Sequence, residues 1–529
     1  MLDLFAVSVS SFLLCLLITP LARILARRYH LVDRPDGRRK LHSEAVAVAG
    51  GIPLLLSASL PLLLYCTYQN RLEAGLGETM IGLLLASVLI CVVGMADDLG
   101  RLRGRHKVLG QVVAVCLVMS FGVQVHTVHL FEYKLELGLL SIPFTAFLLL
   151  GAINSLNLLD GMDGLLCCIG AIICVAMAAT ALVGQNLIAA CIALSLAGAL
   201  LGFLRYNFPP ATIFLGDSGS MLIGLVVGVL AIQSSLKGPA AIALVAPTAV
   251  LIIPIFDTLA AILRRKLTGR SIYCTDRGHL HHCLLRHGFS ARGALLLISG
   301  FCLVTMAGTF ASLAMKNELV ALLSAVSVIA ILIATRLFGH AELELVLKRL
   351  RSFAVQFVRG PRTEKPHETA VRLQGTVDWR ELWMAIVIRG TELNLSRIRL
   401  DVNAPAINEG YHARWDRGHR DSEDIQLWRA DIPLSVQGRM IGQVEVTGYR
   451  DEEPVWTKMT ALANLLQEFE EQASRLTDGA WKALPREGMA ARPIEPAEEF
   501  GLEEDKMLEE ENVGAGPRVS MIESRGLAG

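Results

Sequence analysis

The chain has no excess of charge, because its 529 residues include 49 Lys and Arg against 49 Asp and Glu. A neutral chain offers no bulk electrostatic attraction for nucleic acid, so no nucleic-acid partner is expected. Disulfide pairing is not indicated either. Most of the 11 cysteines lie inside apolar runs, where cysteine behaves as a small hydrophobic residue.

Charged residues are also missing from long stretches of residues 1–337. Hydrophobic residues make up 53% of the chain and its mean hydropathy is +0.50, which is too apolar for a soluble protein. Runs long enough to cross about 30 Å of hydrocarbon predict an all-α polytopic membrane protein with about eleven transmembrane helices. The expected spans are 3–24, 45–67, 79–96, 108–125, 140–157, 165–183, 186–204, 217–234, 239–262, 295–314 and 317–337.

Lysine and arginine are scarce in every second loop of this predicted bundle. The loops on one side carry most of the basic residues, whereas the opposite loops carry only Arg71, Lys134, Lys237 and Lys316. By the positive-inside rule the basic loops are cytosolic, the N-terminus lies outside and the C-terminus lies inside. The first residues, M-L-D, contain no Lys or Arg, so we expect an uncleaved first helix rather than a signal peptide.

The composition changes after Leu337. Leucines interleaved with Lys and Arg predict an amphipathic helix on the inner membrane surface over 338–360. A polar linker is expected at 361–370, a small cytosolic α+β domain at 371–476 and a disordered acidic tail at 477–529. The domain faintly resembles GAF-type sensory domains; a module that binds an unknown regulator and a structural appendage without a ligand are both open. Its expected elements are helices near 378–390 and 454–476 and strands near 395–403, 411–416, 425–435 and 440–449.

A polar stretch, Asn154 to Gly164, reads N-S-L-N-L-L-D-G-M-D-G and follows the uncharged run Ser141 to Ile153. Because a central Asp costs about 2.5 to 3.5 kcal/mol in a membrane, its two acids would cost roughly 5 to 7 kcal/mol if lipid surrounded them. They must face water, protein or a ligand, which makes them candidates for a functional site. Hard amide and carboxylate oxygens suit Mg²⁺, whereas helix capping explains one such side chain but not four. The four, spaced three apart, are Asn154, Asn157, Asp160 and Asp163.

Two more acidic clusters lie at the ends of predicted helices. Asp97 and Asp98 end the third span, and such adjacent carboxylates ask for a cation, either a metal or a basic group such as Lys107. For an Asp pair alone, a solvated helix end is the simpler interpretation. Residues 214–220 read F-L-G-D-S-G-S, in which Asp217 is either a helix N-cap or part of a site where a metal-bound diphosphate approaches the helix N-terminus.

Two basic clusters lie on the same predicted side. The stretch Arg38 to Gly51 includes Lys40 and a double glycine, which suit phosphate and close backbone approach, although a positive-inside anchor is the simpler interpretation. The loop from Asp257 to Arg292 contains D-R-G-H-L-H-H at 276–282 and several arginines, donors that suit a nucleotide diphosphate. Its C-x4-H-x-H-H-C spacing lacks the paired ligands of a structural zinc site.

All five clusters fall on the cytosolic side of the predicted bundle. We therefore expect one cytosolic site that combines hard-metal ligands with cations and acts on a soluble polyanion and a lipid. An ion-coupled transporter is the alternative from another class of protein. Transporter acids lie near the bilayer midplane, often with an internal repeat, whereas here the acids lie at same-side helix ends and we detect no repeat.

With these clusters in this order, residues 1 to about 337 resemble the polyprenyl-phosphate N-acetylhexosamine-1-phosphate transferase family. The resemblance implies an eleven-helix bundle in the bacterial cytoplasmic membrane, with a cytosolic active-site cleft. It also implies transfer of N-acetylhexosamine-1-phosphate from a UDP-sugar to undecaprenyl phosphate with release of UMP, the first membrane step of a cell-surface polysaccharide. Mg²⁺ is the expected cofactor, with Mn²⁺ as an alternative. The glycan and the oligomeric state are left open, a homodimer among the alternatives.

Together with the basic clusters, the resemblance assigns residues to the site by position. Asp97, Asp98 and Lys107 are expected to be catalytic, at the family's aspartate pair and its downstream lysine. Asn157 and Asp217 are expected to hold the metal. The residues expected to bind substrate are Lys40, Asn154, Asp160, Asp163, Arg265, Arg277, His279, His281 and His282.

The histidine loop distinguishes two branches of the family. Its H-x-H-H form, with Leu280 interposed, looks like the GlcNAc-1-phosphate branch, whereas the phospho-MurNAc-pentapeptide branch is expected to have three consecutive histidines. GlcNAc-1-phosphate transfer is therefore expected, with pentapeptide transfer as the alternative. The chain departs from the family before the double glycine, where Ala45, Ala47 and Val48 stand in place of the usual prolines and basic residue. This departure bears on the rigidity of that loop.

Overall fold

The computed structural model describes residues 2–33, 45–68, 76–130, 133–236, 245–268, 278–359, 367–374, 377–404, 407, 409–417, 427–436, 439–449, 455–482 and 518–522. The chain forms two compact units. The first comprises the described residues up to Leu263 and those from His279 to His340, and the second comprises those from Arg264 to Gly278 and from Ala341 onward.

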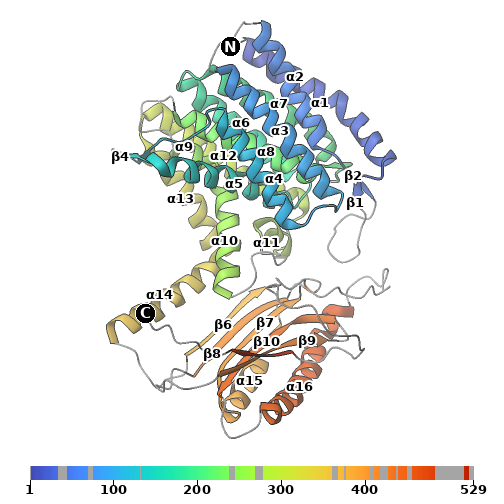
Figure 1. Cartoon of the computed structure of the whole chain (residues 1–529), viewed down its shortest axis with the longest axis vertical. Coiled ribbons are helices and arrows are strands. Elements are labelled where there is room, and N and C mark those ends of the chain that lie inside the picture. The colour runs from blue at the N-terminus through green and yellow to red at the C-terminus, as the bar shows by residue number, and fades with distance from the viewer. Residues whose placement is uncertain are drawn as a thin grey trace, which may run out of the picture. The chain divides into compact units, whose positions relative to one another are not determined.

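The first unit is a bundle of apolar helices (Figure 1). Within the described residues, eight helices are long and apolar enough to cross a membrane, so the chain is a multi-pass membrane protein. These helices are α1 (Leu2–Arg28), α2 (Gly51–Tyr68), α3 (Leu76–Asp98), α5 (Ser141–Leu159), α6 (Leu165–Val183), α7 (Leu187–Asn207), α8 (Gly216–Leu236) and α12 (Ala291–Met315).

The centre of the bundle is formed by α6, α7 and α8. The buried share of their apolar windows is 67%, 72% and 78%, against 28% for α1 and 33% for α12. Because α1 and α12 are apolar along their length yet mostly unburied, their outer faces suit contact with lipid. Small residues allow close crossings in the interior. A Cβ at Gly198 of α7 would clash with the backbone of Ser8 in α1.

The predicted count of eleven spans is not established by the described residues. Two helices of 17 residues, α4 (Gly104–Ser120) and α13 (Glu318–Ala334), are shorter than the eight. The expected span 239–262 is represented by two helices, α9 (Val245–Val250) and α10 (Ile252–Thr268). Pro254 lies in the first turn of α10 and has no N–H to donate to the carbonyl of Val250, which accounts for the break.

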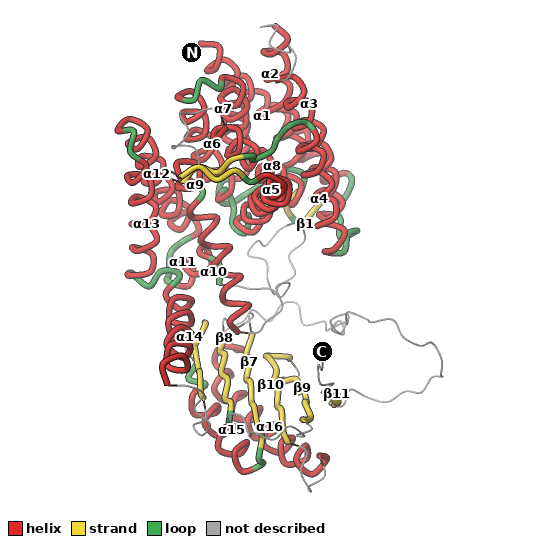
Figure 2. Tube along the Cα trace, turned by 60° about the vertical axis from the view of Figure 1, so that its left-hand side comes forward, coloured by secondary structure: helices red, strands yellow, loops and turns green. Residues whose placement is uncertain are grey.

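The second predicted span, 45–67, starts too early. Residues Val46–Val48 form a strand, β2, and α2 begins only at Gly51. Strand β2 pairs antiparallel with β1 (Val32–Asp33) and parallel with β5 (Ile213–Phe214), so a small sheet joins three distant segments. Figure 2 also shows the hairpin of β3 (Thr127–Leu130) and β4 (Tyr133–Glu136), which precedes a short turn, η1 (Gly138–Leu140), and α5.

The double glycine is explained by packing. A Cβ at Gly50 would lie 2.7 Å from the Cα of Leu215, and a Cβ at Gly51 would lie 2.7 Å from the Cβ of Ser218. Only glycine permits this approach between the start of α2 and the start of α8. The glycines thus allow a close approach between two segments of the chain itself, and their predicted role beside a phosphate stays a prediction.

The second unit contains a six-stranded antiparallel sheet in the order β11-β9-β10-β7-β8-β6. Two helices, α15 (Arg380–Glu392) and α16 (Val455–Lys482), lie against it, and the core includes Trp379 and Trp383. Helix α14 (His340–Arg359) precedes the sheet in the chain. The strands are β6 (His367–Gln374), β7 (Leu395–Ala404), β8 (Glu409–Asp416), β9 (Leu427–Val436), β10 (Arg439–Tyr449) and β11 (Arg518–Ile522).

All six elements expected within the α+β domain are present, but two edge strands were not predicted. The expected linker 361–370 overlaps β6, which begins at His367. The expected disordered tail 477–529 overlaps the end of α16 and contains β11; the rest of the linker and tail lies outside the described residues. The unpaired N–H and C=O groups of a sheet edge can recruit a polar segment that has no strong strand pattern of its own. The GAF-type resemblance stays a prediction.

Candidate active site

Lys107 connects two acidic clusters of the sequence. Its ammonium lies 2.8 Å from Asp97 Oδ2, at the end of α3, and 2.8 Å from Asp217 Oδ2, in the first turn of α8. Burial alone would lower the pKa of Lys107, but Asp217 and Asp97 outweigh it and raise the pKa above its ordinary value. The side chain is therefore a permanent cation between two carboxylates.

Asp98 has a different orientation from its neighbour. Its Oδ1 accepts the backbone N–H of Asp217 at 2.7 Å and its Oδ2 accepts that of Ser218 at 3.2 Å. These N–H groups belong to the first turn of α8, where a helix has unsatisfied donors and a partial positive charge. Gly216 precedes them at φ +67°, and a Cβ there would lie 2.6 Å from Asp98 Oδ2. Asp98 thus caps α8 from another helix, the role that the sequence suggested for Asp217.

Asn157, in the last turns of α5, contacts the same carboxylate of α8. Its Nδ2 donates to Asp217 Oδ1 at 2.6 Å and to Ser220 Oγ at 2.8 Å. Ser220 Oγ in turn donates to the carbonyl of Gly216 at 2.9 Å. The amide N–H groups of Asn157 are therefore engaged by α8, and its carbonyl oxygen is the atom left to face a cation.

The acids of this site outnumber the cation that pairs with them. Asp160 caps the C-terminus of α5, and burial raises its pKa well above the usual range, with Asp217, Asp98 and Asp163 adding repulsion. Among the described residues, the ion pairs that these acids form are those of Asp97 and Asp217 with Lys107. The surplus of carboxyl groups over cations and the hard oxygen donors fit a divalent cation such as Mg²⁺, whose charge would stabilise the ionised carboxylates.

The protein side chains supply only part of a metal site. No three His, Cys, Asp or Glu side chains of the described residues are grouped closely enough to hold a metal by themselves. Mg²⁺ commonly takes one or two carboxylates and completes its shell with water and substrate phosphate. Asp217 and Asn157 match that arrangement, because they offer one carboxylate and one amide at the same place.

Two residues expected to bind substrate have protein partners instead. Asn154 and Gln111 exchange hydrogen bonds of 3.0 and 3.3 Å, which join α5 to α4. Asp163 Oδ2 accepts the backbone N–H of Ala211 at 2.9 Å, which fixes the end of the acidic stretch to the loop after α7. Both contacts give these side chains a structural role. The predicted nucleoside contact of Asp163 stays a prediction.

Asn207 was missed by the sequence analysis. It is buried at the end of α7, where Oδ1 accepts the N–H of Gly164 at 3.0 Å and Nδ2 donates to the carbonyl of Ile213 at 2.9 Å. It therefore holds the acidic stretch beside the strand that leads into α8. The available signal was an amide at the end of an apolar run, the same signal that singled out Asn154.

The histidine motif forms the start of a short helix, α11 (Leu280–Arg286). His279 and His281 are 6% and 2% exposed, and their rings stack with centroids 6.1 Å apart. The ring of His281 lies 4.2 Å from that of His282 and lies against Gly161, where any Cβ would clash with it. The histidine motif therefore contacts the acidic stretch, and both belong to the first unit.

His281 is buried without hydrogen-bond partners for either ring nitrogen among the described residues. Burial, followed by the neighbouring His282 and His279, lowers its pKa well below the ordinary value, so the ring is neutral. Buried polar atoms normally have a partner, from protein, water or a ligand. The histidine cluster therefore retains capacity for polar contacts with a bound molecule.

The structure describes one of the three basic residues predicted for the site. Lys40 and Arg277 lie outside the described residues. Arg265 is buried near the end of α10 and belongs to the second unit. Its neighbour Arg264, also proposed from sequence as a diphosphate donor, forms a buried ion pair with Glu342 of α14. Arg264 thus links the end of α10 to the start of α14.

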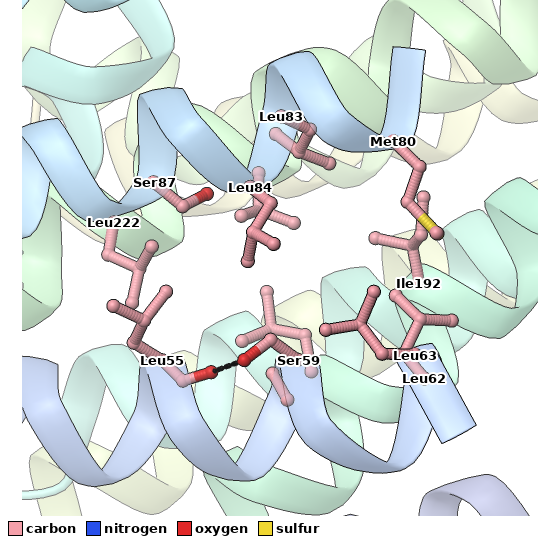
Figure 3. A pocket seen from close by; sticks show the side chains of 13 residues that line it. Leu55, Ser59, Leu62, Leu63, Met80, Leu83, Leu84, Ser87, Ile192 and Leu222 are labelled. Atoms are coloured by element: carbon pink, nitrogen blue, oxygen red, sulfur yellow. Dashed lines mark hydrogen bonds between the residues drawn. The ribbon is translucent and has the colours of Figure 1, made fainter. Parts of the chain in front are cut away.

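A small apolar hollow lies between α2, α3, α7 and α8. Figure 3 shows its lining, in which Ser59 donates a hydrogen bond to the carbonyl of Leu55 and Ser87 adds a second hydroxyl. No charged side chain lines it. The hollow suits a hydrocarbon group and does not suit a diphosphate, which separates it chemically from the acidic site.

Comparison with known proteins gives consistent matches. Residues 80–235 match the family described as Glycosyl transferase family 4. The chain is 32% identical over 290 residues to the "Probable undecaprenyl-phosphate N-acetylglucosaminyl 1-phosphate transferase" of Bacillus subtilis (strain 168), over 54% of this chain and 79% of the relative. It is 34% identical over 308 residues to the "Decaprenyl-phosphate N-acetylglucosaminephosphotransferase" of Mycolicibacterium smegmatis, over 52% and 74% of the two chains.

A relative from the other branch also matches. The "Phospho-N-acetylmuramoyl-pentapeptide-transferase" of Thermoanaerobacter sp. (strain X514) is 28% identical over 292 residues, over 53% of this chain and 87% of the relative. The names of the first two relatives give a polyprenyl phosphate and N-acetylglucosamine phosphate, whereas the name of the third gives phospho-N-acetylmuramoyl-pentapeptide.

Proposed function

Because this chain belongs to glycosyl transferase family 4, together with polyprenyl-phosphate N-acetylglucosamine-1-phosphate transferases, we propose that it transfers GlcNAc-1-phosphate from UDP-GlcNAc to undecaprenyl phosphate. The observation that carries the proposal is the bridge of Lys107 between Asp97 and Asp217, with Asn157 on the same carboxylate. Oxygen ligands and a cation thus gather at the ends of membrane helices, where a soluble nucleotide can meet a lipid phosphate.

In the proposed reaction, an oxygen of the lipid phosphate attacks the β-phosphorus of UDP-GlcNAc. A bond forms between these atoms, and the bond from the β-phosphorus to the bridging oxygen breaks, so that UMP leaves with the electron pair. The second pKa of a phosphate monoester is about 6, so the nucleophile is mostly dianionic at neutral pH and needs no general base. The larger barrier is repulsion between two polyanions. Phosphoryl transfer is catalysed mainly by positioning and by neutralising this charge.

Each residue of the site then has a defined task. Lys107 brings positive charge to the phosphates and keeps Asp97 and Asp217 in place. Asp98 fixes the start of α8 and hence the position of Asp217. Asp217 and Asn157 would hold Mg²⁺, which when bound supplies positive charge to the phosphate oxygens. The buried histidines of α11 supply polar contacts to the diphosphate.

The choice of sugar rests on the histidine motif. Leu280 separates His279 from His281 and is itself buried, and the rings of these two histidines stack. This H-x-H-H arrangement favours GlcNAc-1-phosphate over the pentapeptide-bearing sugar. Pentapeptide transfer is the second candidate, because a relative with that name matches over 87% of its own length.

A donor-specificity assay tests the proposal. Purified protein with undecaprenyl phosphate is offered UDP-GlcNAc, UDP-GalNAc or UDP-MurNAc-pentapeptide, each with Mg²⁺ and with excess chelator. We expect UMP release with UDP-GlcNAc and Mg²⁺, and little with the other donors or with chelator. Faster release from UDP-MurNAc-pentapeptide would establish the second candidate instead.

The location of the enzyme is part of the same proposal. We place the protein in the bacterial cytoplasmic membrane, with the N-terminus outside and the site in the cytosol, because UDP-sugars are cytosolic and the basic loops lie on the side of the acidic clusters. Protease protection of the two termini in oriented membrane vesicles checks this topology. Cleavage of both termini from the same side would contradict it.

A further inference from the structure

Asp257, in α10, is almost completely buried, with 1% of its surface exposed. Its Oδ2 lies 3.0 Å from Nδ1 of His279, and its Oδ1 accepts the backbone N–H of Leu280 at 2.8 Å. Both contacts fall at the start of α11, on the first histidine of the motif and on the residue after it. None of the tasks described above uses this carboxylate.

These contacts determine where the proton of His279 lies. A buried carboxylate is stable only when hydrogen-bond donors surround it. The N–H of Leu280 is one donor, so Nδ1 of His279 must carry the hydrogen that faces Asp257. Nε2 is then the ring nitrogen that faces other groups.

The same contacts fix the orientation of the following histidine. Asp257 holds the first turn of α11, and the ring of His281 stacks on that of His279 with an interplanar angle of 7°. His281 in turn lies against Gly161 of the acidic stretch. A rigid series of contacts therefore runs from α10 through two histidines to the loop that carries Asp160.

We propose that Asp257 is a positioning residue for donor binding: it sets the proton and the orientation of His279 so that the ring nitrogen Nε2 can accept a hydrogen bond from a hydroxyl or N–H group of the UDP-sugar. This inference rests on the proposed function and adds to it a residue that acts through His279 and does not itself touch substrate. Where a carboxylate orients a metal-ligating histidine, its loss typically costs about 10 to 100-fold in affinity or activity, and we expect a factor of this size here.

The test compares Asp257→Asn with the wild-type protein. Asn can still accept the N–H of Leu280, so α11 keeps its capping contact, but its NH2 group forces Nδ1 of His279 to become an acceptor. We expect an unchanged melting temperature, about a 10 to 100-fold loss of kcat/KM for UDP-GlcNAc and an unchanged KM for undecaprenyl phosphate. The matched control is Asp3→Asn, the same change at an exposed residue of α1, with no expected effect.

A double variant separates a positioning role from a merely structural one. If Asp257 acts through His279, then Asp257→Asn combined with His279→Gln is no slower than His279→Gln alone. Wild-type kcat/KM in Asp257→Asn, or losses that multiply in the double variant, would overturn the inference. Calorimetric binding of UDP-GlcNAc keeps this test independent of turnover. A wild-type protein that releases no UMP would contradict the proposed function. Binding of UDP-GlcNAc would then still test Asp257: weaker binding by Asp257→Asn would support the positioning role, and unchanged binding would overturn it.

Discussion

Asp98 at the end of α3 accepts the backbone N–H of Asp217 at the start of α8, over 2.7 Å. The adjacent Asp97 points instead to Lys107, 2.8 Å away. Neighbouring positions of a helix diverge by about 100°, so one helix end can serve two different partners. The two acids therefore converge on Asp217 by different routes, one through its backbone and the other through its side-chain cation.

Replacing Asp98 tests the first route. In Asp98→Asn the carbonyl oxygen of the amide can accept a hydrogen bond from one of the two N–H groups of α8. The NH2 group would face the other N–H, from which it cannot accept. Because a displacement of about 1 Å at a reacting centre can cost about 100-fold, we expect UMP release to fall by about that factor. Stability should fall by only about 1 kcal/mol, the usual contribution of a cap. Both are measured on purified protein.

The control for Asp98 is Glu78→Gln, an exposed acid in the first turn of the same helix. It removes the same charge at the other end of α3, and we expect wild-type rates. Full Mg²⁺-dependent UMP release by Asp98→Asn would show that the capping contact does not matter for the reaction.

Replacing Lys107 tests the second route. In Lys107→Gln the carboxylates of Asp97 and Asp217 lose their shared cation, so we expect at least a 100-fold loss of UMP release. The exposed Arg105→Gln, two residues earlier in the chain, removes equal charge and should retain activity. Near-normal rates in Lys107→Gln, at saturating Mg²⁺, would mean that the bridge is structural only.

The charge of Lys107 also predicts how its contribution to thermal stability depends on pH. Its pKa is raised in the folded protein, so Lys107 is fully charged below its unfolded pKa of about 10.4, and on the alkaline side the ion pairs are lost only as pH rises through the folded value. We expect the thermal stability that Lys107 contributes to be constant from about pH 7.5 to about pH 9, above the raised pKa of Asp98 of about 6. A stability difference between the wild type and Lys107→Gln that titrates within this range would contradict the bridge.

Gly161 provides a test of the contact between the acidic stretch and α11. A Cβ at this position would clash with the ring of His281. Gly161→Ala should therefore displace the histidine and raise the KM for UDP-GlcNAc, with kcat less affected, in steady-state kinetics. Gly151→Ala is the matched control, because a Cβ at Gly151 meets nothing within 4 Å and alanine favours the helix. Equal kinetics for the two variants would remove His281 from the donor site.

Helix α14 presents an apolar stripe, formed by Leu343, Leu347 and Leu350, which are 42%, 44% and 57% exposed. Arg349 and Arg351 flank it, as suits a helix that lies on an anionic lipid surface. A photoreactive amino acid at position 350 should cross-link to phospholipid in proteoliposomes. The same label in place of Met384, an exposed apolar residue of α15, should not. Equal lipid labelling at both positions, or none at either, would exclude the proposed surface contact.

The sequence allowed the chemistry of the site to be predicted because acids cost free energy in membrane-length helices. Asp97, Asp160 and Asp217 were recognisable for that reason, and amides at the same helix ends completed the set. The partners of these residues were not predictable. The contact of Asp98 with the backbone of α8, and that of Asp257 with His279, join residues more than 20 positions apart and depend on packing alone.

The limits of the fold prediction have similar causes. Apolar runs located most of the helices, but hydropathy does not detect a short strand such as Val46–Val48, which is apolar like the helix after it. It also did not detect the break between α9 and α10. The buried pair Arg264 and Glu342 joins two helix ends of the second unit, and its basic member was interpreted from sequence as a phosphate donor.

The most direct test of the proposed reaction follows one phosphorus atom. UDP-GlcNAc labelled with ³²P in the β-phosphate is incubated with the protein, Mg²⁺ and undecaprenyl phosphate, and the lipid and aqueous products are separated. The account predicts that the label moves to the lipid and that unlabelled UMP appears in equal amount. Label that remains in water-soluble UDP, while the sugar alone moves to the lipid, would contradict it.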